Sequence, residues 1–280
     1  MTAINTPAEN AILKNIRHVC LDMDGTIYKG SDLFPYTKSF LARLDNMGIG
    51  YTFLTNNSSK SVEAYIEHLA RMGVEADRER IYTSGLATMD FLRVDYPQVK
   101  RIFVLGTPSL KAEFERNEFQ LVSGAPDDEP DAVIVGFDTT LAYEPLCQCA
   151  WWIGQGKPFI ATHPDLVCPT NQPTILVDCG AMCRMLEAAT GRQLDAVPGK
   201  PDPRMLQGIM RRHGLNSNEV AMVGDRIYTD VAMAQNADAV GVLVLTGEAT
   251  QADADAAPRK PDFVLESIQV LGEKLAAARE

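Results

Sequence analysis

Short apolar runs alternate with amphipathic segments along this chain. The apolar runs predict strands, and the segments whose apolar positions recur every three or four residues predict helices. Up to residue 95 the predicted strands are 17–22, 50–55 and 81–84, and the predicted helices are 36–47, 61–72 and 87–95. This alternation is typical of an α/β fold in which helices cover both faces of a parallel sheet.

The alternation starts afresh after residue 100 and changes again near residue 195. The second series comprises strands 101–106, 132–136 and 158–162, helices 109–117, 145–154 and 182–190, and a polar loop over 123–131. The third comprises helices 203–213, 230–236 and 267–278, strands 219–223 and 240–244, a loop over 251–258 and an edge strand at 263–264. We therefore expect a discontinuous core domain, residues 1–85 and 195–280, with a small α/β domain, residues 86–194, inserted into it.

Two carboxylates on alternate residues follow the first predicted strand. Asp22 and Asp24 can point to the same side of an extended strand end, and Gly25 lets the chain turn sharply after them. Like charges so close resist simultaneous ionisation unless a cation neutralises them or one keeps its proton, and either state suits a nucleophile beside a general acid. The pattern indicates a phosphate site, with an acidic turn that ends the strand as the alternative.

Two later segments offer groups that could hold a phosphate. Thr55, Asn56 and Asn57 end the second strand before a helix, where hydroxyl, amide and backbone N–H groups form an anion cradle. The same residue types also serve as ordinary turn and helix-capping residues. Lys200, between a glycine and a proline, could place a fixed positive charge on a phosphate, or it could be a solvated surface residue.

Asp225 and Asp230 follow another strand of the buried type. Ligands of open parallel sheets bind beyond the carboxyl ends of the strands, so these acids are expected on the same side as Asp22 and Asp24. The carboxylates of Asp22 and Asp225 and the backbone at Asp24 are hard oxygen ligands that suit Mg²⁺, and no His/Cys cluster accompanies them to suit zinc.

Taken in order, these segments resemble the haloacid dehalogenase superfamily of phosphohydrolases. Residues 22–26 (DMDGT) resemble its first motif, Thr55 the second, Lys200 the third, and Asp225 with Asp230 the fourth. The segment between Thr55 and Lys200 resembles the subclass IIA cap, shared with p-nitrophenyl phosphatase-like and phosphoglycolate or pyridoxal phosphate phosphatase-like enzymes. The residues that carry this closer resemblance are 55–57 (TNN), 135–138 (VGFD), 161–165 (ATHPD), 188–192 (AATGR) and 199–201 (GKP).

The resemblance implies a Rossmann-like parallel-sheet core with an inserted α/β cap, and Mg²⁺-dependent hydrolysis of a small phosphate monoester. Asp22 would attack phosphorus to form an aspartyl phosphate, while Asp24 would protonate the leaving group and then activate water. Mg²⁺ would bridge Asp22, the Asp24 carbonyl and Asp225. Asp230 would orient Lys200 or a metal-bound water, or else cap the helix that follows. The residues expected to hold the phosphate are Thr55, Lys200, Gly25, Asn56 and Asn57.

Two cap segments depart from the family pattern. Residues 162–165 read THPD where the family more often has Thr-Asn-x-Asp, and residues 177–180 read VDCG where it has a Pro-Gly-x-Gly-like turn. The loop over 163–180, which includes Asn171, could cover the core cleft if a rigid α/β scaffold holds it. We expect His163 and Asp165 to contact the leaving group and so to select the substrate, with a turn capped by Asp165 as the alternative.

Other classes of function are open at this point. A dehalogenase or an ATPase of this superfamily is expected to lack an acid at position 24, so Asp24 favours a phosphatase. A phosphomutase or another phosphotransferase would use the same acid pair, but with a different type of cap. A phosphometabolite-binding module without catalysis is the non-enzymatic alternative, and the filled catalytic positions argue against it.

Composition and charge bear on location and partners. The 280 residues are 46% hydrophobic and 22% charged, which is ordinary for a globular protein, and the formal net charge is −11. This charge disfavours nucleic acid and anionic membranes as partners, although Mg²⁺ and Lys200 can reverse the potential inside one cleft. The sequence shows neither a signal-like apolar stretch near its start nor a run that could span a membrane. We expect a cytoplasmic protein that acts on a small phosphorylated metabolite, and a homodimer through the cap is left open.

The six cysteines offer the main rival chemistry. Cys147 and Cys149, and Cys179 and Cys183 with His163, can be imagined as metal ligands or disulfide partners. Their spacings match no standard zinc pattern well, and residues two apart on a helix do not share a face. Reduced, mostly buried thiols are therefore expected.

Overall fold

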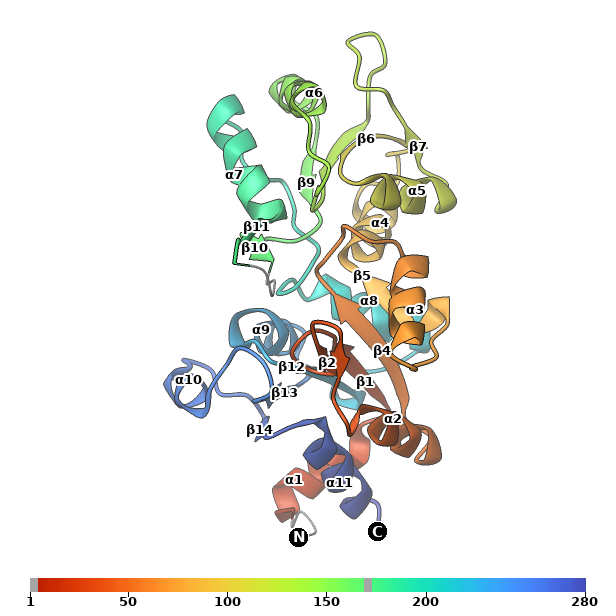
Figure 1. Cartoon of the computed structure of the whole chain (residues 1–280), viewed down its shortest axis with the longest axis vertical. Helices are drawn as coiled ribbons and strands as arrows, with labels where there is room; N and C mark the ends of the chain where they lie inside the picture. The colour runs from red at the N-terminus through yellow and green to blue at the C-terminus, as the bar shows by residue number, and fades with distance from the viewer. Residues whose placement is uncertain (1–4, 169–172) are drawn as a thin grey trace. The chain divides into compact units, whose positions relative to one another are not determined.

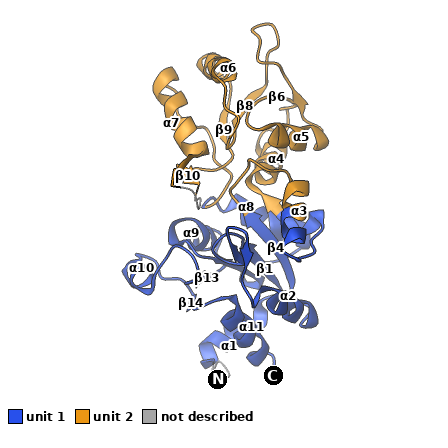
Figure 2. Ribbon diagram, viewed as in Figure 1, with its two compact units in different colours: residues 1–54, 68–81, 201–280 blue, residues 55–67, 82–200 orange. Residues whose placement is uncertain are grey.

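The fold is that of a computed structural model, in which the described residues are 5–168 and 173–280. The chain divides into two compact units (Figure 2): unit 1 is Met1–Leu54, His68–Ile81 and Pro201–Glu280, and unit 2 is Thr55–Glu67 and Tyr82–Lys200. The domain limits expected at residues 85 and 195 fall near two of these boundaries, whereas residues 55–67 group with unit 2. The assignment of a core domain and an inserted cap stays a prediction.

Unit 1 is built on a parallel sheet (Figure 1). The strands of this sheet follow the order β14 (Phe263–Leu265), β13 (Val240–Val244), β12 (Val220–Gly224), β1 (His18–Asp22), β4 (Gly50–Thr55) and β5 (Ile81–Thr83). The last residue of β4 and the last two of β5 group with unit 2. Strand β1 pairs in parallel with both β12 and β4, and Asp22 lies opposite Leu54 in the register. All residues of β12 and β13 are buried, as a sheet covered on both faces requires.

Helices and a short hairpin complete unit 1. Helices α2 (Thr37–Asn46) and α11 (Ile268–Ala277) pack so closely that a methyl group on Gly272 would lie 3.0 Å from the Phe40 ring. Helix α1 (Pro7–Asn15) lies beside α11, where Lys274 pairs with Glu9 at 2.8 Å. The remaining elements are β2 (Tyr28–Lys29), β3 (Asp32–Leu33), η1 (Arg78–Arg80), α8 (Arg204–His213), η2 (Ser217–Glu219), the π-helical turn η3 (Ile227–Val231), α9 (Ala232–Asn236) and α10 (Gln251–Ala256), with α3 (Val62–Arg71) shared between the units.

Unit 2 contains its own parallel sheet with helices on both faces. The strand order is β7 (Gln120–Leu121), β6 (Arg101–Leu105), β8 (Ala132–Val135) and β9 (Phe159–Ala161). Side chains of β8 alternate: Val133 and Val135 pack with α6 (Tyr143–Gly154) and α7 (Cys179–Thr190), whereas Ala132 and Ile134 pack with α4 (Ser84–Asp95) and α5 (Pro108–Arg116). A small antiparallel pair, β10 (Val167–Cys168) and β11 (Leu176–Val177), precedes α7.

The predicted α/β fold class is confirmed, and several local predictions are corrected. Strands 50–55 and 240–244 have the expected limits, and an edge strand forms at 263–265. The predicted loop over 251–258 is wrong, because residues 251–256 form α10, capped by Thr250. Helix α7 begins at Cys179 rather than at 182, and the helix expected over 230–236 is preceded by a π-helical turn. Within residues 5–168 and 173–280, each helix lacks the length or the hydropathy needed to cross a bilayer.

His18, at the start of β1, makes the stability of unit 1 depend on pH. The residue is 4% exposed, and its Nε2 lies 2.9 Å from Thr52 Oγ1. Its ring stacks on that of His213, with ring centroids 4.5 Å apart. Burial, and then the positive charges of His213 and Arg80, lower its pKa from 6.5 to about 4. Between about pH 4 and 6.5, His18 therefore binds a proton in the unfolded chain but not in the folded one. This contribution to the free energy of unfolding is complete above about pH 6.5 and is lost as the pH falls toward 4.

We expect the free energy of unfolding to fall by about 2 kcal/mol from this source between about pH 7.5 and pH 5. Urea unfolding of the wild type and of His18→Gln at both pH values measures it, because the variant should lose that part of the pH dependence. An equal pH dependence in the two proteins would contradict the assignment.

Candidate active site

Three carboxylates of unit 1 come together at the carboxyl edge of its sheet. Asp22 is the last residue of β1, Asp225 directly follows β12, and Asp230 lies in η3. One oxygen from each of these side chains lies within 4.8 Å of the other two. Because β1 and β12 are parallel neighbours, their carboxyl ends lie at the same edge. The structure thus brings together Asp22 and Asp225, the expected carboxylate ligands of the metal.

The Asp225 carboxylate is enclosed by backbone. A methyl group on Gly25, whose φ is +86°, would lie 2.4 Å from Oδ2 of Asp225, and one on Gly247 would lie 1.9 Å from the same oxygen. Glu248 N donates to this oxygen at 2.8 Å, and Ala249 N donates to the Asp225 carbonyl at 3.1 Å. The loop after β13 therefore fixes Asp225. Sequence analysis missed this loop, although a glycine shortly after an apolar strand is the signal that marked Gly25.

Asp24 lies in the tight turn that follows β1. Gly25 N donates to the Tyr28 carbonyl at 2.8 Å, and Gly30 N donates to Oδ1 of Asp24 at 3.4 Å. The Asp24 side chain is exposed. A group that must exchange protons with a leaving group and with water needs this access.

Asp230 lies within η3, so the expectation that it caps the following helix is wrong: the N-cap of η3 is Arg226 and that of α9 is Val231. Oδ2 of Asp230 accepts a hydrogen bond from Arg226 N at 3.2 Å, which is a contact within the first turn of η3. Its carboxylate also belongs to the cluster with Asp22 and Asp225. A role beside the metal is compatible with this position and stays a prediction.

Arg226 is a charged neighbour of the acid cluster that sequence analysis did not single out. Burial lowers the pKa of its guanidinium, but Tyr228, Asp225, Asp22 and Glu248 together hold that pKa above its ordinary value. Nε of Arg226 lies 2.9 Å from Oε2 of Glu248. The guanidinium therefore places a permanent positive charge near Asp22 and Asp225.

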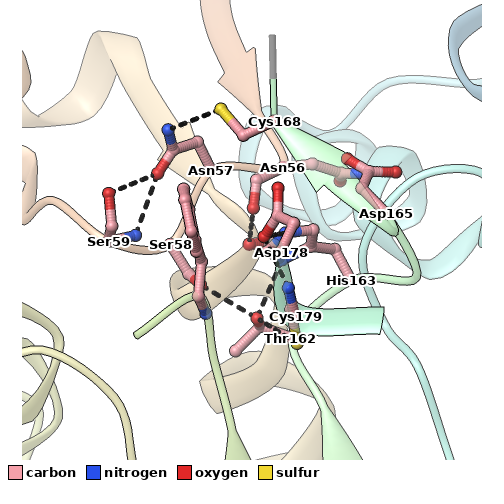
Figure 3. A network of polar contacts seen from close by, with 12 residues as sticks. Asn56, Asn57, Ser58, Ser59, Thr162, His163, Asp165, Cys168, Asp178 and Cys179 are labelled. Carbon is pink, nitrogen blue, oxygen red and sulfur yellow. Dashed lines mark hydrogen bonds and ion pairs between the residues drawn. The ribbon is translucent and has the colours of Figure 1, made fainter. Parts of the chain in front are cut away.

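In unit 2, the residues that follow β4 form a compact turn (Figure 3). Oγ1 of Thr55, the last residue of β4, accepts a hydrogen bond from Asn57 N at 3.1 Å. Asn57 Oδ1 accepts from the backbone N and Oγ of Ser59 at 3.0 and 2.7 Å. The Asn57 side chain thus stabilises a turn, which was the alternative to phosphate binding. Along the chain, Thr55 comes directly after Leu54, the strand partner of Asp22.

The side chain of Asn56 hydrogen-bonds to the backbone of Lys200. Oδ1 of Asn56 accepts from Lys200 N at 2.8 Å, while Nδ2 donates to the Lys200 carbonyl at 3.0 Å and to Oδ2 of Asp165 at 3.2 Å. Both Asn56 and Lys200 are buried. The amide is engaged in these three contacts, so its direct contact with phosphate stays a prediction, whereas its contact with Lys200 is present.

His163 lies in the interior of unit 2 (Figure 3). It is fully buried, with Nε2 2.9 Å from Oδ1 of Asp178 and Nδ1 2.9 Å from Oγ1 of Thr162. The enclosed ring, with both nitrogens engaged, disagrees with the expected contact between His163 and a leaving group. Asp165 is half-buried and bonded to Asn56, and Asn171 lies outside the described residues.

The six cysteines all fall within the described residues, and none of them is in a disulfide there. Cys147 is exposed and Cys149 is buried in α6, so the two thiols face different environments, as their spacing predicts. In the described parts of the chain, the groupings that could hold a metal ion consist of Asp22, Asp225 and Asp230, or of His163, Asp165 and Asp178, and include no cysteine.

Comparisons with protein families and with individual proteins agree on the family of this chain. Residues 19–120 match the haloacid dehalogenase-like hydrolase family, and residues 197–271 match a related HAD-hydrolase-like family. The acid sugar phosphatase of Staphylococcus epidermidis is 30% identical over 258 residues, which cover 92% of this chain and 97% of that protein.

Solved structures agree with this result. The 4-nitrophenylphosphatase of Thermotoga maritima is 40% identical with a TM-score of 0.87, and the match covers 94% of this chain and 98% of that one. The glycerol phosphate phosphatase of Mycobacterium tuberculosis, solved in complex with magnesium, is 28% identical with a TM-score of 0.85, and the match covers 93% of this chain and 78% of that one.

Proposed function

Because this chain belongs to the haloacid dehalogenase-like hydrolases, we propose that it hydrolyses a small phosphate monoester through an aspartyl phosphate on Asp22. The observation that carries the proposal is the cluster of Asp22, Asp225 and Asp230 at the carboxyl edge of the unit 1 sheet, one turn from Asp24. The relatives named as phosphatases support hydrolysis of a phosphate monoester as the reaction.

The acid cluster fits Mg²⁺ as the cofactor. Its donors are carboxylate oxygens close enough to share one small hard cation, and Mg²⁺ prefers such donors together with water. The carboxylates of Asp22 and Asp225 and the backbone carbonyl of Asp24 would hold it, and when bound it would neutralise charge on the transferring phosphoryl group. The magnesium complex of the mycobacterial relative supports this choice.

The proposed reaction has two steps. A carboxylate oxygen of Asp22 attacks phosphorus, the ester P–O bond breaks, and Asp24 gives its proton to the leaving alkoxide. Asp24, now a carboxylate, takes a proton from water as that water attacks the phosphorus of the aspartyl phosphate, which releases inorganic phosphate and regenerates Asp22. The exposed position of Asp24 supports both proton transfers.

The proposed phosphate-binding groups are the side chains of Thr55 and Lys200. Thr55 would donate its hydroxyl to a phosphate oxygen, and Lys200 would place its ammonium on another. Lys200 is buried, and the Asn56 side chain hydrogen-bonds to its backbone, so these contacts support a defined position for Lys200 within unit 2. Asn56 thereby contributes through Lys200.

The proposed substrate is a small phosphorylated metabolite, and sugar phosphates come first because relatives are named acid sugar phosphatases. A cytoplasmic location and a homodimer formed through the cap belong to the same proposal. Release of inorganic phosphate from p-nitrophenyl phosphate and from a panel of sugar phosphates, phosphoglycolate, nucleotides and pyridoxal phosphate, ranked by kcat/KM, tests it. We expect turnover of p-nitrophenyl phosphate with Mg²⁺, and a total lack of phosphate release across the panel would contradict the proposal.

A further inference from the structure

The two departures from the family pattern meet in the interior of unit 2. His163 belongs to the first and Asp178 to the second, 15 residues apart, and Nε2 of His163 lies 2.9 Å from Oδ1 of Asp178. Their side chains are 0% and 3% exposed. A histidine and a carboxylate paired at this depth form a single structural feature, because either partner alone would leave a buried polar group without its match.

This pair joins a loop to the first turn of α7 (Figure 3). Asp178 is the N-cap of α7, and its Oδ1 also accepts from Cys179 N at 2.6 Å. Two backbone hydrogen bonds run alongside, from Gly180 N to the Asp165 carbonyl at 2.8 Å and from Asp178 N to the Leu166 carbonyl at 3.0 Å. The loop around His163 is therefore attached to the helix by one side-chain pair and two backbone contacts.

The charge state of His163 agrees with this arrangement. Burial lowers its pKa, but Cys179, Asp178 and Asp165 favour the protonated ring and raise the pKa to about 9. At neutral pH both ring nitrogens then donate, one to Asp178 and the other to Thr162 Oγ1. Thr162 Oγ1 lies in turn 3.0 Å from Ser58 Oγ, which accepts from Phe137 N.

The same loop supports Lys200. A methyl group on Gly199 would lie 2.4 Å from the Thr162 carbonyl oxygen and 2.8 Å from Cβ of His163, so the backbone before Lys200 lies directly against this loop. Asp165 orients the Asn56 amide by accepting from Nδ2, and that amide binds both the N–H and the carbonyl of Lys200. If the Asn56 amide were rotated by about 180°, its NH₂ group would face the Lys200 N–H and its oxygen would face the Lys200 carbonyl and Asp165, so all these hydrogen bonds would be lost.

We propose that His163 and Asp178 are a positioning pair for Lys200. By fastening residues 162–165 to α7, they fix the surfaces on which Gly199, Asn56 and hence Lys200 are placed. They act on phosphate binding without touching the substrate. This inference rests on the proposed function in one respect, namely that Lys200 binds the substrate phosphate.

The experiment compares His163→Gln, Asp178→Asn and the double variant, each in the wild-type background and in a Lys200→Gln background. The probe is inorganic phosphate, read as its inhibition constant against p-nitrophenyl phosphate and by calorimetry with Mg²⁺ present. Asp131→Asn is the matched control, because the Asp131 carboxylate likewise accepts backbone hydrogen bonds in unit 2, in its case from Lys100 N and Arg101 N.

We expect each single variant to weaken phosphate binding about tenfold and to raise KM, whereas Asp131→Asn leaves both unchanged. In the Lys200→Gln background the same substitutions should have no further effect, because their influence passes through Lys200. The double variant buries no charge, and its two amides can hydrogen-bond to each other, so it should recover part of the lost phosphate binding. It also allows the test to be made if a single variant does not fold.

Two results would overturn the inference. An equal loss of phosphate binding with and without Lys200 would show that the pair acts on the fold of unit 2 as a whole. Unchanged phosphate binding in folded Asp178→Asn would show that Lys200 does not depend on the pair. Failure of the proposed function is distinguishable, because phosphate binding would then be unaffected by Lys200→Gln alone.

Discussion

Asp22→Asn should abolish turnover, with a loss of about four orders of magnitude or more in kcat for p-nitrophenyl phosphate. The amide is nearly the same size as the carboxylate but cannot act as the nucleophile, so the chemical step is lost. Asp22 ends β1 at the edge of the sheet and is only half-buried, so the substitution should leave the fold intact. Phosphate release measures the loss, and circular dichroism with urea unfolding measures the fold.

Asp32→Asn is the matched control for this prediction. It makes the same chemical change at an exposed position of β3, also in unit 1, and should leave kcat unchanged. Activity of Asp22→Asn within tenfold of the wild type would remove Asp22 from the role of nucleophile.

Removal of divalent metal should have an effect of similar size. Exhaustive dialysis against EDTA should abolish activity and added Mg²⁺ should restore it, because clustered carboxylates repel the substrate phosphate unless a cation neutralises them. Ca²⁺ should restore activity poorly, since it prefers longer bonds and more ligands. Full activity after dialysis, or a stoichiometric requirement for zinc, would contradict the metal assignment.

Gly247→Ala links this metal requirement to the structure. The added methyl group would lie 1.9 Å from Oδ2 of Asp225, so the carboxylate must move, and the Mg²⁺ concentration for half-maximal activity should rise about tenfold or more. Gly154→Ala is the control, because a methyl group there meets nothing within 4 Å. Equal Mg²⁺ dependence of the two variants would show that the position of Asp225 does not govern metal binding.

The parallel sheet and the acidic motifs could be predicted because each is encoded locally. Strands buried on both faces are continuous apolar runs, so residues 50–55 and 240–244 were found with their limits. Two missed helices also had local signals. Thr6 and Glu9 form a capping box before α1, and Thr250 and Asp253 form one before α10, where the alanine and aspartate content suggests a loop.

The supporting parts of the site could not be predicted because they depend on contacts between distant segments. Asn56 hydrogen-bonds to Lys200, which is 144 residues away in the sequence. A glycine is needed at position 247 because the Asp225 side chain lies against its backbone. The burial of His163 likewise depends on Asp178 and on the start of α7. In the sequence, these residues have the same types as ordinary turn and surface positions.

The phosphoryl group that Asp22 is proposed to carry can be trapped on the protein. Asp24→Asn should form the intermediate from p-nitrophenyl phosphate, whose leaving group needs no proton, and should hydrolyse it slowly because the base for the second step is missing. Acid quenching, borohydride reduction of the acyl phosphate and sequencing of the tryptic peptide that spans residues 18–29 locate the modification. Homoserine is expected at position 22, and an unmodified Asp22 in a variant that still releases p-nitrophenol would show that Asp22 does not carry the phosphoryl group.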